Sequence, residues 1–325
     1  MMIEECVFHT YLIHIHHEVT MSKKVHIAGV LFASIFGFTF MFSKVAMNYV
    51  SPIGLIAYRF LIAFLAFEAL RLFKVIKIRF EKRHMKDLFL VALFQPILYF
   101  LTETYGLRIT TSGEAGLMIA MIPIFVTILS SLILKEKPRF IQLLFILLSV
   151  GGVIFIQMFK VQDGIAFEAL GYLLLLGAVL SAAFFNIASR NASKQLKPYE
   201  ITYFMMLYGA VIFNLMYLVK LVSEGRIIDY VLNLYHVELV LPILYLGIVA
   251  SIGGFFLVNF ALSQAPAHIT SIYSNLSTIV AIIAGTLLLN ETLSYYHYIG
   301  SAMIIIGVYG TVRFRRYQPK LKKNV

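Results

Sequence analysis

The sequence contains a long internal repeat whose two copies align with each other without a gap. A shift of 155 residues places Leu107 on Leu262 and Glu136 on Glu291. Matches at a constant spacing over this distance indicate that one structural unit was duplicated within the chain. The duplication constrains the fold because both halves are expected to form the same arrangement of secondary structure.

The repeated unit is too apolar for a soluble domain. Hydrophobic residues make up 60% and charged residues 13% of the chain, whereas soluble domains contain about 45–50% apolar and about 25% charged residues. A transmembrane helix needs about 20 apolar residues. Runs of that length lie at 26–49, 54–73, 87–108, 113–134, 139–159, 169–190, 199–220, 239–262, 266–289 and 294–313. We therefore predict an all-α integral membrane protein with ten transmembrane helices.

Short polar segments separate the predicted helices and the two repeats. The residue before a proline disfavours helix, so Ser51-Pro52 and Ala265-Pro266 mark expected helix boundaries. The predicted parts are an N-terminal extension at 1–24, a first five-helix repeat at 25–159, a linker at 160–168, a second five-helix repeat at 169–315 and a basic tail at 316–325.

We expect the N-terminal extension to be disordered, with Met21 as the natural start. The alternative is a metal site, which would use Cys6, His9, His14, His16, His17 and Glu18. We favour the extension, and we expect no metal and no cofactor. A single cysteine also excludes a disulfide within the chain.

The distribution of positive charge orients the predicted helices. One set of alternate loops, with the tail, carries 21 of the 27 Lys and Arg residues, and the opposite set carries only Arg108, Lys160, Lys220 and Arg226. Cytoplasmic loops of membrane proteins are enriched in Lys and Arg, so both termini are predicted to be cytoplasmic. The net charge of +11 thus indicates a membrane surface rather than nucleic acid.

An odd number of spans in each half would turn the second half upside down. We therefore predict two inverted five-helix repeats, an arrangement typical of secondary transporters, whose binding sites lie between the repeats near the membrane midplane. Phosphate-loop, zinc-protease and nucleophile-elbow motifs are absent from the sequence. The sequence therefore predicts that the protein is not an enzyme.

Charged residues within the predicted spans are candidates for a binding site or gate, because charges are costly in a bilayer. Lys44, Arg59 and Glu103 are each expected about 7–8 Å inside the outer boundary. The planar guanidinium of Arg59 suits a carboxylate or phosphate. Tyr99 and Glu114 complete the charged and aromatic candidates of the first half. Alternatively, Lys44 extends to the surface, and Arg59 and Glu103 form a fixed pair.

The second half offers neutral polar candidates at the opposite depth: Asn186, Asn259, Tyr273 and Asn275. These residues could line a vestibule or, alternatively, hold helices together. Glu136 and Glu291 follow one predicted span and precede the next. Because a carboxylate is stabilised at a helix N-terminus, we interpret both as structural caps of helix hairpins, one at each surface.

The sequence resembles the EamA-type transporters of the drug/metabolite transporter superfamily over about 26–313. In the first half the resemblance rests on GVLFASIFGFTFMFSKVAM, SPIGLIAYRFLIAFLAF and YGLRITTSGEAGLMIAMIPIFVTILSSLILKEKPRFIQLLFILLSVGGVIFI. In the second half it rests on FALSQAPAHITSIYSNLSTIVAIIAGTLLLNETLSYYHYIGSAMIIIGVYG. Members of this family commonly carry the counterparts of Arg59, Glu136 and Glu291. The halves differ from each other, since Thr278 stands where Pro123 would repeat and Asn186 where Lys44 would.

The resemblance implies a secondary transporter in a bacterial inner membrane. Its substrate would be a small metabolite, such as an amino acid, amine, organic acid or drug-like compound, exported by alternating access. A proton could be the coupling ion, with Glu103 or Glu114 as its carrier. The alternative is a membrane protein that does not transport, such as a lipid-handling enzyme or a sensor. The family does not fix the substrate, and the sequence does not give the oligomeric state.

Overall fold

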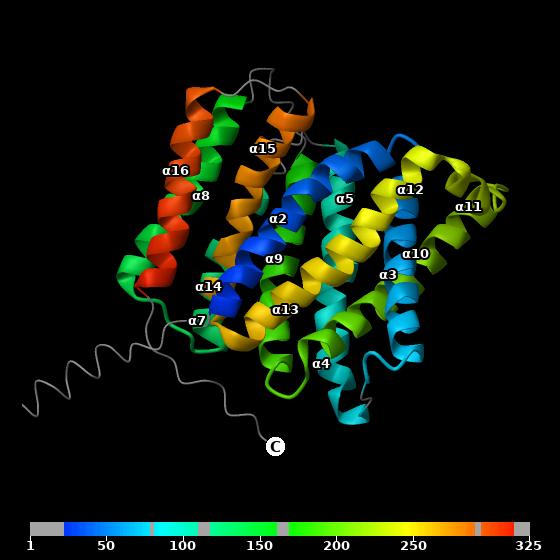
Figure 1. Ribbon diagram of the computed structural model, residues 1–325, viewed down its shortest axis with the longest axis horizontal. Helices are drawn as coiled ribbons and strands as arrows, with labels where there is room; N and C mark the ends of the chain where they lie inside the picture. Colours follow the sequence, from blue (N-terminus) through cyan, green and yellow to red (C-terminus); the bar gives the residue numbers. More distant parts are fainter. Residues whose placement is uncertain (1–22, 79–80, 110–117, 161–168, 290–293, 315–325) are drawn as a thin grey trace, which may run out of the picture.

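The computed structural model describes residues 23–78, 81–109, 118–160, 169–289 and 294–314, and the secondary structure in these ranges is helical (Figure 1). Seven of the described helices are long and apolar enough to cross a membrane. Shorter apolar helices cover Ile122–Ile133 and Phe140–Ile156. The protein is therefore an all-helical membrane protein, in agreement with the predicted class, and the count of ten spans stays a prediction.

The elements follow the two sequence halves. The first half contains α2 (Lys23–Ala46), α3 (Pro52–Leu72), η1 (Lys82–His84), α4 (Met85–Ala92), η2 (Leu93–Leu98), α5 (Tyr99–Ile109), α7 (Ile122–Ile133) and α8 (Phe140–Lys160). The second half contains α9 (Ala169–Ala192), α10 (Pro198–Ser223), α11 (Asp229–Leu232), η3 (Asn233–Tyr235), α12 (Val237–Leu244), η4 (Tyr245–Gly254), α13 (Phe255–Gln264), α14 (Ala267–Ile272), η5 (Tyr273–Asn275), α15 (Leu276–Leu289) and α16 (Tyr295–Arg313).

Local sequence explains where two of these helices begin. Pro52 occupies the first position of α3, and the Ser51 side chain accepts a hydrogen bond from the amide of Gly54 at 3.4 Å. Proline is favoured at this position because its fixed φ suits the first helical turn, where no amide donor is needed. α10 likewise begins with Pro198, and the Glu200 carboxylate accepts a hydrogen bond from the Lys197 amide at 2.8 Å. Both starts lie where the sequence predicts a break or a short loop.

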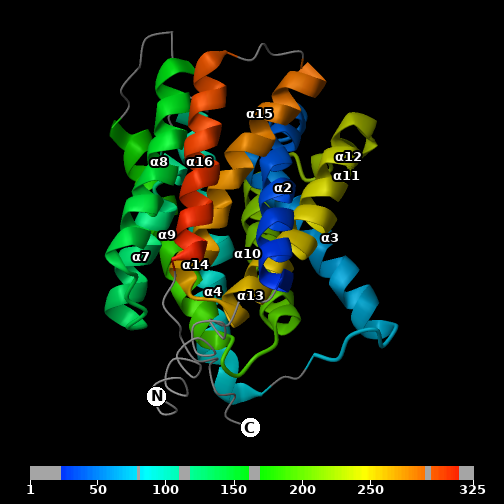
Figure 2. The same ribbon diagram turned by 60° about the vertical axis from the view of Figure 1, so that its left-hand side comes forward.

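The last helices of the two halves, α8 and α16, pack against each other in antiparallel directions at one edge of the bundle (Figures 1 and 2). A Cβ at Gly152 would lie 2.7 Å from the Gly300 carbonyl oxygen, and one at Gly307 would lie 2.6 Å from the Phe145 carbonyl oxygen. Glycine is needed at these positions because only it lets the two backbones approach so closely.

The second helices of the halves, α3 and α10, form another antiparallel pair. Gly54 near the start of α3 meets Tyr217 near the end of α10, and Phe60 further along α3 meets Gly209. α2 packs against η4, α13 and α15 of the second half, while α9 packs against η2, α5 and α7 of the first half. The first helix of each half thus lies against the third and fourth helices of the other half, and both halves line the centre.

Candidate functional site

A cavity of about 320 Å³ lies between the two halves. Its aromatic lining consists of Phe32, Phe36, Tyr99, Phe100, Phe185 and Phe255. Its polar and charged lining consists of Thr39, Ser43, Arg59, Gln95, Tyr99, Glu103, Thr104, Asn186, Thr270, Ser271, Ser274, Asn275, Ser277 and Thr278. Apolar walls with a few convergent polar groups are typical of small-molecule sites.

Arg59 enters the cavity from α3 with part of its guanidinium already bonded. Nε donates a hydrogen bond to Oγ of the buried Ser251 at 2.7 Å, and the guanidinium carbon lies 4.7 Å from the centre of the Phe100 ring. In the described part of the chain this is the guanidinium's only hydrogen bond. Ser251 and Phe100 therefore fix the orientation of Arg59 and leave its two terminal nitrogens for an anionic group.

Glu103 and Tyr99 line the same cavity from α5. One Glu103 carboxylate oxygen accepts a hydrogen bond from the Thr104 hydroxyl at 3.3 Å. Among the described residues, no ion pair within 4.0 Å joins Arg59 to Glu103. Arg59 and Glu103 therefore do not form the direct ion pair considered from the sequence, although the two charges interact electrostatically across one cavity.

The helix that carries Glu103 is broken just before α5. Gln95 in η2 has the extended angles φ −149° and ψ 115° within an otherwise helical segment, and it lines the cavity. Broken transmembrane helices expose backbone polar groups and are typical of transporter binding sites. Gln95 was not predicted from the sequence as a lining residue, because a break in the helix at this position has no sequence signal other than the proline that follows it.

Hydrogen-bond acceptors, in contrast to the donors of Arg59, line the cavity along α14, η5 and α15. We call this face the acceptor wall and define it as Ser271, Ser274 and Ser277. Each hydroxyl donates to the carbonyl three residues earlier in the chain, at 3.2, 2.7 and 2.6 Å respectively. Because a serine hydroxyl has one proton and two lone pairs, its oxygen can still accept. Asn186, also in the lining, bonds the Ala182 carbonyl through Nδ2 and so retains an acceptor oxygen.

Two predicted site residues do not line the cavity. Asn259 is fully buried, where it accepts from Ser189 at 2.6 Å and donates to Thr202 at 2.9 Å. The Tyr273 hydroxyl bonds His26 Nδ1 at 2.6 Å, although the neighbouring Asn275 does line the cavity. Asn259 and Tyr273 are therefore corrected to residues that join helices, because depth in a span does not tell which face of the helix a side chain occupies.

Three other predicted residues cannot be placed. Glu114 and Glu291 lie outside the described residues. Lys44 belongs to α2, but its side chain is outside the described part of the molecule. The sequence-based expectations for these residues stay predictions. In the described ranges no cluster of three or more His, Cys, Asp or Glu could hold a metal ion.

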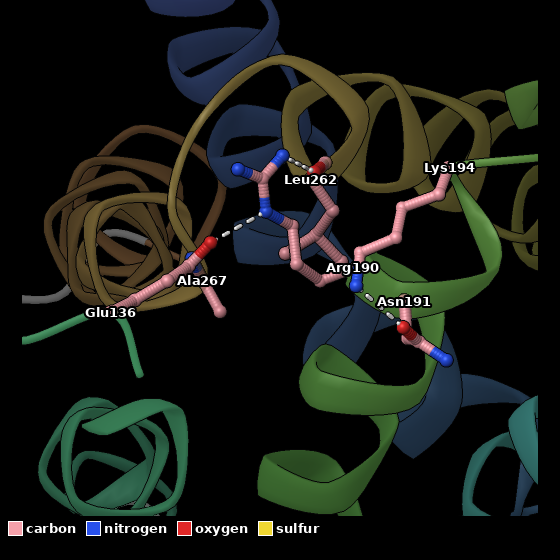
Figure 3. Close-up of polar contacts among 6 residues, drawn as sticks. All are labelled: Glu136, Arg190, Asn191, Lys194, Leu262 and Ala267. Carbon is pink, nitrogen blue, oxygen red and sulfur yellow. Dashed lines mark hydrogen bonds and ion pairs between the residues drawn. The ribbon is translucent and has the colours of Figure 1, made fainter. Parts of the chain in front are cut away.

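Glu136 caps a helix, but one that belongs to the other half (Figure 3). One of its carboxylate oxygens accepts from the Ala267 amide at the start of α14 at 2.9 Å, and the other accepts from Arg190 Nε at 2.9 Å. The hairpin cap that we predicted is therefore replaced by a contact between the halves. Arg190 is one of the 21 Lys and Arg residues assigned from the sequence to the basic loops and the tail, and no local sequence pattern identified Glu136 as its partner.

Comparisons with known proteins agree on the family. The model of the EamA-like transporter family matches residues 23–158 and 169–313, one match in each half. The uncharacterized transporter YcxC of Bacillus subtilis is 38% identical over 88% of this chain and 92% of its own length. A protein named "probable amino-acid metabolite efflux pump" from Escherichia coli is 24% identical over 93% of this chain and 99% of its own length.

A solved crystal structure shares the fold, with a TM-score of 0.70 and 17% identity over 90% of this chain and 98% of that chain. The two family matches coincide with the two halves that the repeat defines. This family consists of transporters rather than enzymes. The chain belongs to the EamA-like transporter family.

Proposed function

We propose that this protein is a secondary transporter that exports a small zwitterionic metabolite with an apolar side chain. The observation that carries the proposal is the guanidinium of Arg59, whose terminal nitrogens have no partner in the described part of the chain although the residue is only 6% exposed. These nitrogens face the cavity, so their unused donors are available to an anionic group that enters it. A carboxylate would fit this fork with two parallel hydrogen bonds.

The rest of the cavity fits the other parts of such a substrate. Glu103 and the acceptor wall offer acceptors to an ammonium group, and the ring-lined surface near Phe36 and Phe255 suits an apolar side chain. A volume of about 320 Å³ suits a single metabolite. The name of the Escherichia coli relative, an amino-acid metabolite efflux pump, agrees in substrate class and direction.

Alternating access between inverted halves would carry the substrate across the membrane. The antiparallel pairs α8–α16 and α3–α10 support ten spans arranged as two inverted repeats. The excess of Lys and Arg in one set of loops supports cytoplasmic termini in a bacterial inner membrane. The cavity would then be exposed first to one side of the membrane and then to the other.

A proton is the proposed coupling ion. Among the described residues, Glu103 supplies the carboxylate of the cavity lining. It could therefore exchange a proton with the solution on whichever side of the membrane the cavity is open to. Glu114, the other candidate, lies outside the described residues. The alternative of a lipid-handling enzyme or a sensor is disfavoured, because the family consists of transporters.

Binding to purified protein tests the substrate class. L-phenylalanine serves as the zwitterionic probe, and its amide, which lacks the carboxylate, and phenylpropionate, which lacks the ammonium, serve as matched analogues. We expect the zwitterion to compete with labelled L-phenylalanine at least about tenfold better than either analogue, since each lacks one charge-assisted hydrogen-bonding group. Equal competition by all of them, or no binding of any, would contradict the proposal.

A further inference from the structure

A buried ion pair joins the two halves beyond one end of the cavity. Arg190 and Glu136 are 6% and 7% exposed, and Arg190 Nε lies 2.9 Å from a Glu136 carboxylate oxygen. Arg190 also donates through Nη1 to the Leu262 carbonyl at 2.7 Å, and Glu136 accepts from the Ala267 amide at 2.9 Å. Figure 3 shows these contacts, which link the segment after α7 to α9, α13 and α14.

Each helix in this network also lines the cavity about one turn away. On α9, Asn186 lines the cavity and Arg190 follows one turn later. On α13, Val258 lines the cavity and the carbonyl of Leu262 follows one turn later. On α14, Ala267 precedes the lining residue Ser271 by one turn. Since one turn of helix rises about 5.4 Å, the ion pair lies directly beyond the cavity floor.

The cavity is not symmetric about its centre. At the far end its lining includes Met47, which follows α2, and Leu107, near the end of α5. At the other end the lining stops at Asn186, Val258 and Thr270, and the ion pair lies between these residues and the basic loops. The cavity therefore extends toward one face of the protein and is blocked toward the other.

We propose that Glu136, Arg190 and the α13–α14 junction form the closed cytoplasmic gate of this cavity. This inference rests on the proposed function, because it takes the cavity to be the site that binds the transported substrate. Removing either charge leaves the other buried without a partner of opposite charge, a condition that destabilises the closed arrangement. Separation of the first-half segment from α9 and α14 would return both charges to water and open the cavity to the cytoplasm.

The surroundings favour a separable contact over a permanent one. Ser193 Oγ and His268 Nδ1, each close in sequence to a member of the gate, are buried without a hydrogen-bond partner among the described residues. Unpaired buried polar atoms raise the free energy of the closed state. Lys194, two residues after α9, donates a hydrogen bond at 2.8 Å to Asn191 near the end of that helix, so this contact would move with Arg190 (Figure 3).

Thiol labelling tests the gate without any transport substrate. The sole cysteine is removed by Cys6→Ser, and Ser274→Cys places a reporter in the cavity lining. A membrane-impermeant maleimide is added to right-side-out and to inside-out membrane vesicles. With the gate intact, we expect labelling from the outer face and little from the cytoplasmic face.

Glu136→Gln is the informative variant, because it removes the charge but keeps an oxygen for the Ala267 amide. We expect labelling from the cytoplasmic face to become at least about tenfold faster, as the population of open protein rises. Arg190→Lys keeps the charge but lacks the two separate nitrogens that bond Glu136 and Leu262, and should give an intermediate rate. Glu68→Gln is the matched control: Glu68 pairs with Arg71 at 2.6 Å and is absent from the cavity lining.

Unchanged cytoplasmic labelling in folded Glu136→Gln or Arg190→Lys protein would overturn the proposal and leave the ion pair as a static brace. Folding is checked by monodisperse elution in detergent. If Glu136→Gln does not fold, the Arg190→Lys result alone decides. Faster cytoplasmic labelling together with a failure of L-phenylalanine to bind would support the gate and contradict only the substrate proposal.

Discussion

Arg59 and Glu103 face one cavity from α3 and α5 but form no ion pair within 4.0 Å. Opposite charges that met directly would neutralise each other and leave little for a ligand. Here Arg59 is instead held by Ser251 and the Phe100 ring, and the Glu103 carboxylate accepts from the Thr104 hydroxyl. This separation of the charges supports the proposed zwitterionic substrate.

The planar pair of N–H donors on the Arg59 guanidinium should contribute to substrate binding beyond the effect of its positive charge. Arg59→Lys keeps a cation but loses the planar pair of donors and the contact with Phe100, so we expect the apparent KM for L-phenylalanine to rise about tenfold. Arg59→Gln, which also removes the charge, should raise it further. Uptake kinetics in proteoliposomes measure both values. Equal KM values for Arg59→Lys and the unmodified protein would show that no carboxylate binds there.

Ser251 is expected to act as a positioning residue. Ser251→Ala removes the acceptor for Arg59 Nε and leaves the guanidinium free to turn, so the KM for the zwitterion should rise about 5–30-fold with the maximal rate little changed. Ser34→Ala is the matched control, because the Ser34 hydroxyl bonds the Val30 carbonyl of its own helix and is absent from the cavity lining. An identical effect of the two substitutions would argue against this role.

Glu103 should determine proton coupling. Glu103→Gln keeps the shape of the side chain but cannot exchange a proton, so an imposed pH gradient should no longer drive accumulation of L-phenylalanine. Exchange between labelled and unlabelled substrate should persist, since it needs no net proton movement. The measurement is uptake with and without the gradient. Accumulation that still follows the gradient would exclude Glu103 as the carrier.

The contact between α8 and α16 should tolerate no added methyl group at Gly307. Gly307→Ala would place a Cβ 2.6 Å from the Phe145 carbonyl oxygen and from Ser149, so we expect a loss of about 1–3 kcal/mol in the free energy of unfolding. Gly253→Ala is the control, because among the described residues its Cβ would come within 4 Å of Ile35 alone, at 3.9 Å. Unfolding in mixed micelles compares the two variants, and equal stability would contradict the packing described.

The sequence was sufficient to predict the class of fold and several residues that line the cavity. Hydropathy and proline positions gave the helix starts at Pro52 and Ala267, and comparing depths in the spans selected Arg59 and Glu103, which line one cavity. Depth could not separate Asn275, which lines the cavity, from Asn259, which does not. Helices that are apolar on all sides give no periodic pattern from which to read the buried face.

The partner of Glu136 was beyond any local pattern. Its carboxylate meets Ala267 and Arg190, which lie in the other half of the sequence, and only the packing of the two halves brings them together. Ser251 and Phe100 were not predicted as site residues for a similar reason. A serine and a phenylalanine are ordinary in membrane helices, and their roles depend on the side chain of Arg59 that they contact.

Counterflow of labelled L-phenylalanine tests the central claim most directly. Proteoliposomes loaded with unlabelled L-phenylalanine are diluted into labelled L-phenylalanine, and uptake is compared between the unmodified protein and Arg59→Gln. We predict transient accumulation with the unmodified protein and at least about tenfold less at the same concentration with Arg59→Gln. Accumulation that is absent in both, or equal in both, would contradict the claim that this cavity carries a zwitterion on Arg59.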